Sequence, residues 1–141
     1  MYQVEIRVPF RAGHRLCPPY VGKCNNMHGE GFTAILIFES LKLDSCDMVV
    51  DFGVVKKKVK EWIDTEWDHA FLCNENDTGV LKFLKDIDMK WASVGNQNPT
   101  SEVLAKILYH AVCNQLPEGV YLVRVGMVES FSDSVAWYFE D

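Results

Sequence analysis

The sequence predicts an α+β fold in which mostly antiparallel strands are covered on one face by two or three helices. Near both ends of the chain, at 2–8 and 121–127, apolar residues alternate with polar ones, which is typical of half-buried strands. At 54–67 and 104–112 apolar residues instead recur every three or four positions, as in amphipathic helices. The 141 residues suffice for a core, so we expect one domain spanning 1–141.

The first half of the chain is predicted to form three strands and a helix. The alternation of the first strand, at 2–8, continues as far as His14. A second strand is expected from 32 to about 40, after a loop that contains two prolines and a glycine. The short apolar run at 48–50 predicts a third strand, joined antiparallel to the others. The amphipathic helix at 54–67 follows.

The second half is predicted to add two helices and two strands. After a loop rich in polar residues, the apolar residues of 80–91 would lie on one side of a helix, so a helix is predicted there. Thr100 is a natural N-cap for the next helix, which ends before Pro117. The strands at 121–129 and 135–139 then complete the domain.

The net charge of −6 argues against a nucleic-acid surface, which needs a basic patch. It does not exclude an anionic small molecule, because a local pocket can differ in sign from the whole chain. No apolar run approaches the about 20 residues needed to span a bilayer, and the N-terminus does not resemble a signal peptide. We therefore expect a cytoplasmic protein that binds neither nucleic acid nor membranes, with its five cysteines reduced.

A metal site is the first functional hypothesis. His28 and Glu30 are separated by one residue, so in extended backbone their side chains point to one face. With His14 from the first strand, they form a set typical of zinc when one coordination position stays open; the same set suits non-haem iron(II). Taken singly, each residue is more simply a surface or hydrogen-bonded group.

A cysteine beside these residues is a plausible proton acceptor. Cys24 lies four residues before His28, and a thiol near a metal or a basic group loses its proton more readily. Cys17 competes for the role, and an inert buried thiol is the alternative for either. We favour Cys24 because it shares a loop with the predicted ligands.

Two further sites carry acidic or basic side chains. In Asp68-His69, the carboxylate could fix the tautomer of an imidazole that relays protons, provided that the backbone is irregular there. Otherwise Asp68 merely caps an element. Glu129 ends an apolar strand and could bind the NH/NH₂ edge of a heterocycle through both oxygens, or it is simply the first solvated residue after the strand.

Taken together, these residues resemble the 6-pyruvoyl-tetrahydropterin synthase family, over nearly the whole chain and in family order. The matching segments are His14-Arg15-Leu16, Lys23-Cys24 with His28-Gly29-Glu30, Asp68-His69 with Leu72, Asn98-Pro99-Thr100-Ser101-Glu102, and Val128-Glu129. The bacterial 6-carboxy-tetrahydropterin synthases of queuosine and deazaguanine biosynthesis are most similar, notably at 98–106.

The resemblance implies a tunnelling fold with a four-stranded antiparallel sheet and helices on one side. It also implies homo-oligomers in which sheets join into barrels, usually trimers stacked into hexamers, with active sites between subunits. The implied substrate is 7,8-dihydroneopterin triphosphate, and the implied cofactor is Zn²⁺ held by three histidines.

Roles carried over by position cover the metal, proton transfer and substrate binding. They assign His14 and His28 to zinc, Cys24 to proton acceptance, Asp68 and His69 to a relay, Glu129 to the pterin, and Thr100 and Glu102 to substrate binding at the helix start.

One position departs from the family, which has His-Gly-His where this chain has His28-Gly29-Glu30. Glu30 either ligates zinc, shifts the preference to another divalent metal, or marks a protein with weak or no metal and altered catalysis. We favour ligation, because carboxylates are ordinary zinc ligands and Glu reaches further than His.

The expected function is therefore a metal-dependent lyase, most similar to 6-carboxy-5,6,7,8-tetrahydropterin synthase, which eliminates triphosphate and releases acetaldehyde. The alternatives are a 6-pyruvoyl-tetrahydropterin synthase, a metal-free reaction like that of dihydroneopterin aldolases, or a pterin- or purine-binding protein that lost its chemistry through Glu30.

Overall fold

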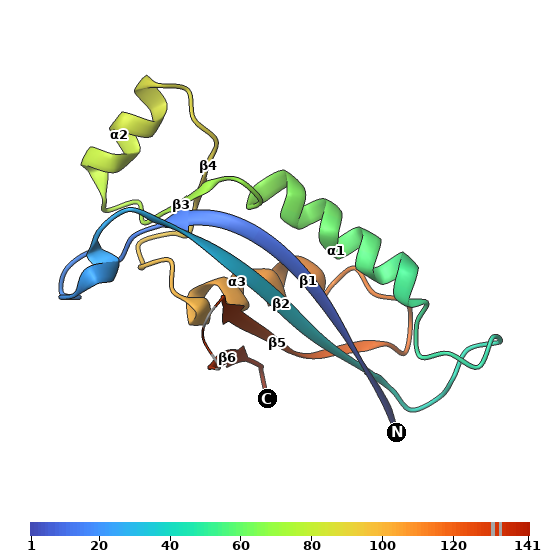
Figure 1. Cartoon of the computed structure of the whole chain (residues 1–141). Helices are drawn as coiled ribbons and strands as arrows, with labels where there is room; N and C mark the ends of the chain where they lie inside the picture. Colours follow the sequence, from blue (N-terminus) through green and yellow to red (C-terminus); the bar gives the residue numbers. More distant parts are fainter. Residues whose placement is uncertain (131, 133) are drawn as a thin grey trace.

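The computed structural model describes residues 1–130, 132 and 134–141, which form a curved sheet with helices packed against it (Figure 1). Within these residues the sheet has six strands in the order β4-β3-β1-β2-β5-β6. The strands are β1 (Tyr2–His14), β2 (His28–Ser40), β3 (Phe71–Cys73), β4 (Trp91–Ser93), β5 (Tyr121–Glu129) and β6 (Val135–Tyr138). The helices are α1 (Phe52–Glu66), α2 (Thr78–Asp86) and α3 (Ser101–Val112), with a short 3-10 helix η1 (Lys23–Asn25).

The long hairpin of β1 and β2 is the centre of the sheet. The two strands pair antiparallel along their whole length, from Tyr2 opposite Ser40 to His14 opposite His28. On its other side β2 pairs with β5, whose last residue, Glu129, lies opposite Phe32. This register brings the ends of β1, β2 and β5 together at one end of the sheet.

The core lies between one face of the sheet and the helices α1 and α3. Alternate side chains of the hairpin point into it, because successive residues of a strand face opposite sides. The rings of Phe10 and Phe32 stack with centroids 5.2 Å apart, and Phe10 lies 5.6 Å from the ring of Trp67. Trp67, directly after α1, is only 1% exposed.

Both core helices begin at capped residues. The side chain of Asp51 accepts a hydrogen bond from the backbone N–H of Val54, and that of Thr100 accepts one from Val103. Each cap satisfies an amide that has no partner within its helix. The N-cap predicted at Thr100 is therefore confirmed.

The α+β prediction is confirmed, and β1, β2, β5 and β6 form the expected antiparallel set of four. The sheet is nevertheless wider than predicted. It also contains β3 and β4: β3 pairs parallel with β1, and β4 pairs parallel with β3. Strands of three residues are too short to display an alternating pattern, so the sequence did not reveal them.

Two predicted elements were wrong in type or extent. Residues 48–50 form no strand; Val49 and Val50 lie in a loop but are 7% and 8% exposed, so burial accounts for their apolar character. The helix predicted at 80–91 ends at Asp86, and Trp91 lies in β4 instead. Figure 1 shows α2 beyond the end of the sheet, away from the core helices. In the described part of the chain no helix is long and apolar enough to cross a membrane.

Replacing Trp67 by alanine should lower the free energy of unfolding by about 3–5 kcal/mol, because the cavity left in the core cannot be refilled. Urea denaturation at matched protein concentrations measures this change. Phe83→Ala is the control, since Phe83 is 51% exposed on α2 and should change stability far less. Equal losses in the two variants would show that Trp67 is not a centre of the core.

Candidate active site and metal-binding group

The β1–β2 register brings together the three residues predicted to bind metal. One potential ligand atom from each of His14, His28 and Glu30 lies within 4.8 Å of the others. The Nε2 atom of His28 is 3.3 Å from Oε1 of Glu30, and the two imidazole rings are 4.6 Å apart between centroids. The convergence expected from the sequence is therefore present in the fold.

Hydrogen bonds fix the orientation of both imidazoles. Nδ1 of His14 lies 2.8 Å from the carbonyl oxygen of Pro99, and Nδ1 of His28 lies 2.7 Å from that of Asn26. A carbonyl oxygen can only accept, so each Nδ1 carries the proton and each Nε2 keeps its lone pair. Both Nε2 atoms are buried and have no hydrogen-bond partner among the described residues.

This donor set fits a divalent cation. Two buried imidazole nitrogens without a hydrogen-bond partner among the described residues lie close to a carboxylate, an arrangement that a positive ion would stabilise. The contact between His28 and Glu30 does not have hydrogen-bond geometry, which agrees with this interpretation. Burial lowers the pKa of His14, only partly offset by its hydrogen bond to Pro99, and so favours the neutral form that binds metals.

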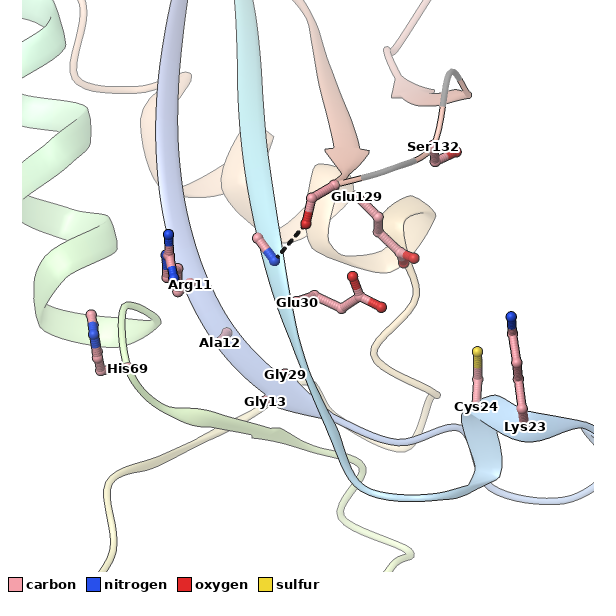
Figure 2. A pocket seen from close by; sticks show the side chains of 12 residues that line it. Arg11, Ala12, Gly13, Lys23, Cys24, Gly29, Glu30, His69, Glu129 and Ser132 are labelled. Carbon is pink, nitrogen blue, oxygen red and sulfur yellow. Dashed lines mark hydrogen bonds between the residues drawn. The ribbon is translucent and has the colours of Figure 1, made fainter.

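A cavity of about 1040 Å³ opens beside this group, close to the point where β5 ends (Figure 2). Four of the predicted site residues line it: Cys24, Glu30, His69 and Glu129. Figure 2 shows Cys24 on η1 at one side and His69 beyond β1 at the other, with Glu30 between them. Groups from four separate segments therefore share one cavity.

Cys24 is held by the chain that follows His14. The backbone N–H of Leu16 donates to the carbonyl of Cys24 at 2.8 Å, and the side chain of Asn25 donates to the carbonyl of Leu16 at 3.0 Å. The hydroxyl of Tyr20 contacts the Cys24 thiol, and this contact raises the pKa of Tyr20. Tyr20 was not identified from the sequence, because only the fold of the loop brings it to Cys24.

Cys17, the competing thiol, lies in a different environment. It is not among the residues that line the cavity, and it sits beside the ion pair of Arg15 and Asp77. Burial, followed by the hydrogen bond to Asp77, raises the pKa of the Cys17 thiol, so it is the weaker candidate for a proton acceptor.

The backbone at Asp68-His69 is irregular, as the relay hypothesis requires. His69 has a positive φ of 59°, which turns its ring back so that Nδ1 lies 2.7 Å from Oδ2 of Asp68. The other oxygen of Asp68 accepts from the backbone N–H of Arg11 at 3.0 Å, and this bond lowers the pKa of Asp68. The ionised carboxylate therefore orients an imidazole that is 75% exposed in the described chain.

Glu129 is half-buried at the end of β5, and Ser101 donates to its Oε1 from 3.1 Å. It also lines a second cavity, of about 450 Å³, together with Ser101 and Glu102. Thr100 lines neither cavity and uses its hydroxyl as the cap of α3. Glu129 thus joins the two cavities, and Glu102 lies only on the second.

Two cations at the first cavity were missed by the sequence interpretation. Arg11 and Lys23 both line it, and neither makes a side-chain ion pair with the described residues. Arg11 is an exposed residue of β1 and Lys23 is the exposed first residue of η1, so the sequence pattern did not distinguish either from an ordinary surface charge.

Comparisons with known proteins identify the family and agree with the fold. A family model described as 6-pyruvoyl tetrahydropterin synthase matches residues 3–141. A 6-carboxy-5,6,7,8-tetrahydropterin synthase from Rickettsia typhi is 31% identical over 105 residues, which cover 74% of this chain and 75% of that protein.

Two solved structures share the fold. An uncharacterised protein from Wolinella succinogenes superposes with a TM-score of 0.83 at 22% identity, covering 99% of this chain and 98% of that one. The 6-pyruvoyl tetrahydropterin synthase of Caenorhabditis elegans gives 0.70 at 23% identity, covering 99% and 96%. Together with the match over 3–141, these findings confirm the expectation of a lyase with this fold: the chain belongs to the 6-pyruvoyl tetrahydropterin synthase family.

Proposed function

We propose that this protein is a 6-carboxy-5,6,7,8-tetrahydropterin synthase that acts on 7,8-dihydroneopterin triphosphate, eliminating triphosphate and releasing acetaldehyde. The observation that carries the proposal is the single cavity that joins Glu30 of the metal-binding group to Cys24, His69 and Glu129. The name of the Rickettsia typhi relative supports the carboxy-forming reaction over the pyruvoyl-forming one. The reaction would belong to cytoplasmic biosynthesis of queuosine and related deazaguanines.

The charges that line the cavity suit this substrate. The carboxylate of Glu129, held on one oxygen by Ser101, is available to accept hydrogen bonds from the NH/NH₂ edge of a pterin. Arg11 and Lys23 supply positive charge for a triphosphate. A local pocket can thus bind an anion although the whole chain has a net charge of −6.

Two groups are assigned to proton transfer. Cys24, as a thiolate, accepts a proton from the side chain of the substrate. His69 carries protons to and from the reacting carbon atoms, and Asp68 holds its ring through Nδ1 at 2.7 Å. A protein that only bound pterins would need neither group in its cavity, which favours an enzyme over the binding alternative.

We assign Zn²⁺ to His14, His28 and Glu30, whose lone pairs converge. Bound there, it would act as a Lewis acid on the side-chain hydroxyls of the substrate. Glu30 partly neutralises the positive charge that three histidines would leave, so we expect a slower or retuned enzyme than one with a third histidine. Another divalent metal, such as iron(II), remains the alternative for this set.

We also propose that the protein is a homo-oligomer, a trimer or hexamer, with sites completed between subunits. The cavity is broad and its walls include the exposed ring of His69, which a neighbouring subunit could cover. The outer strands β4 and β6 end the sheet with edges that can pair with another chain.

Cys24→Ala should lower turnover of 7,8-dihydroneopterin triphosphate about 10²–10⁴-fold, because the proton acceptor is lost. Mass spectrometry identifies the product, and bound metal should be unchanged. The control is Cys46→Ala, an exposed thiol outside the cavity, which should retain full activity. Wild-type protein that leaves the substrate unchanged with added Zn²⁺ would contradict the enzyme assignment itself.

Glu30→Ala should weaken Zn²⁺ binding at least about tenfold, because one of three ligands is removed. Glu30→His should restore binding and change turnover, since the ligand charge changes. Metal analysis of the purified variants and competition with a chromophoric chelator measure these effects. The exposed Glu118→Ala serves as control. If neither metal content nor activity changes in Glu30→His, Glu30 is not a ligand.

A further inference from the structure

The side chain of Asn98 binds the backbone that follows His14 at two points. Its Oδ1 accepts from the N–H of Cys17 at 2.8 Å, and its Nδ2 donates to the carbonyl of the same residue at 3.0 Å. Oδ1 also accepts from the side chain of Asn74 at 3.3 Å. The side-chain amide of Asn98 therefore pairs with the backbone N–H and C=O of Cys17 as a neighbouring strand would, and this pairing fixes the distance between the two segments.

The residue after Asn98 makes the contact that orients His14. The carbonyl oxygen of Pro99 lies 2.8 Å from Nδ1 of His14, and both residues are buried. The segment from His14 to Cys17 and the pair Asn98-Pro99 therefore form a closed loop of contacts. If the amide of Asn98 released Cys17, the Pro99 carbonyl would no longer be held at the imidazole.

The two histidines depend on different parts of the chain. His28 donates to the carbonyl of Asn26, only two residues away, so local backbone conformation is enough to orient it. His14 donates to a carbonyl 85 residues away in the sequence, which only tertiary structure can position. A long-range contact of this kind needs its own support, and Asn98 supplies it.

We propose that Asn98 is a positioning residue for metal binding: by clamping Cys17, it holds the Pro99 carbonyl at Nδ1 of His14 and so aims Nε2 at the metal. Asn98 is not one of the three grouped ligand residues, and it lines neither of the two cavities described above. The inference rests on the metal assignment made above and extends it to a residue outside the ligand set. Such outer groups fix the tautomer of a ligand imidazole and contribute measurably to affinity.

A purely structural role for Asn98 would have a different signature. The same segment is also anchored by Arg15, whose Nε and Nη2 atoms donate to the two oxygens of Asp77 at 2.7 and 2.9 Å. This bidentate pair should preserve the fold when Asn98 is changed. The effect of the change should then fall on His14 rather than on overall stability.

The test compares Asn98→Ala and Asn98→Asp with Asn96→Ala, an exposed asparagine of the same loop that makes no side-chain hydrogen bond with the described residues. Three quantities are measured: the Zn²⁺ dissociation constant by chelator competition, the visible spectrum of the Co²⁺-loaded protein, and the melting temperature of the metal-free protein. Asn98→Asp keeps an acceptor for Cys17 but removes the donor to its carbonyl.

For Asn98→Ala we expect Zn²⁺ binding weakened about 10–100-fold, with an altered Co²⁺ spectrum and a metal-free melting temperature within a few degrees of the wild type. Asn98→Asp should show the same effects, and it decides the question if Asn98→Ala does not fold. Asn96→Ala should match the wild type. Unchanged zinc affinity in the Asn98 variants would overturn the proposal. A loss of zinc affinity that is accompanied by a matching fall in the melting temperature of the metal-free protein would overturn it as well.

Nitrogen-15 NMR of the metal-free protein separates this inference from the metal assignment. The wild type should show His14 with its proton on Nδ1, and Asn98→Ala should show a mixture of tautomers. If the wild type bound no metal but this difference remained, the metal assignment would fail while the positioning role stood. Identical His14 spectra in the two proteins would overturn the positioning role.

Discussion

The pairing register of β1 and β2 is the constraint on which the rest of the site depends. Directly opposed residues share a face of the sheet, so the core pair of Phe10 and Phe32 is followed by Ala12 with Glu30 and then by His14 with His28. The metal-binding group is thus a continuation of the hydrophobic core. If β2 slipped by one residue along β1, Phe32, Glu30 and His28 would turn to the opposite face, away from His14.

Burial and hydrogen bonding determine what the site residues can do. Because Phe32 lies against the ring of His14 at 5.4 Å and the imidazole is 2% exposed, its neutral form is favoured. His69, by contrast, is exposed, and the carboxylate of Asp68 contacts one of its ring nitrogens. The two histidines thus lie in different surroundings, which suit the separate roles proposed for them, His14 as a metal ligand and His69 as a proton carrier.

Sequence patterns predicted most of the fold, and several of the candidate site residues chosen from them lie together in the structure. The hairpin, α1, α3 and β5 have long periodic signals, and His28 and Glu30 were grouped correctly because they are close in sequence. The contact of Pro99 with His14 and the place of Tyr20 beside Cys24 depend on how loops fold back, which no local pattern records. The three-residue strands β3 and β4 were not predicted for the same reason, because tertiary pairing rather than a periodic pattern defines them.

Glu30, at the position where the family has a histidine, changes the charge of the metal-binding group. With two neutral imidazoles and one carboxylate, a bound divalent ion would keep a net charge of about +1 instead of +2, and so polarise a substrate hydroxyl less strongly. In the reaction proposed above, Arg11 and Lys23, which line the same cavity and form no ion pair with the described residues, would then supply positive charge for the leaving triphosphate. The Lewis acidity of the metal and the electrostatic stabilisation of the leaving group are separate contributions to the rate of the proposed reaction. The cost of Glu30 should therefore fall on hydroxyl polarisation rather than on triphosphate departure.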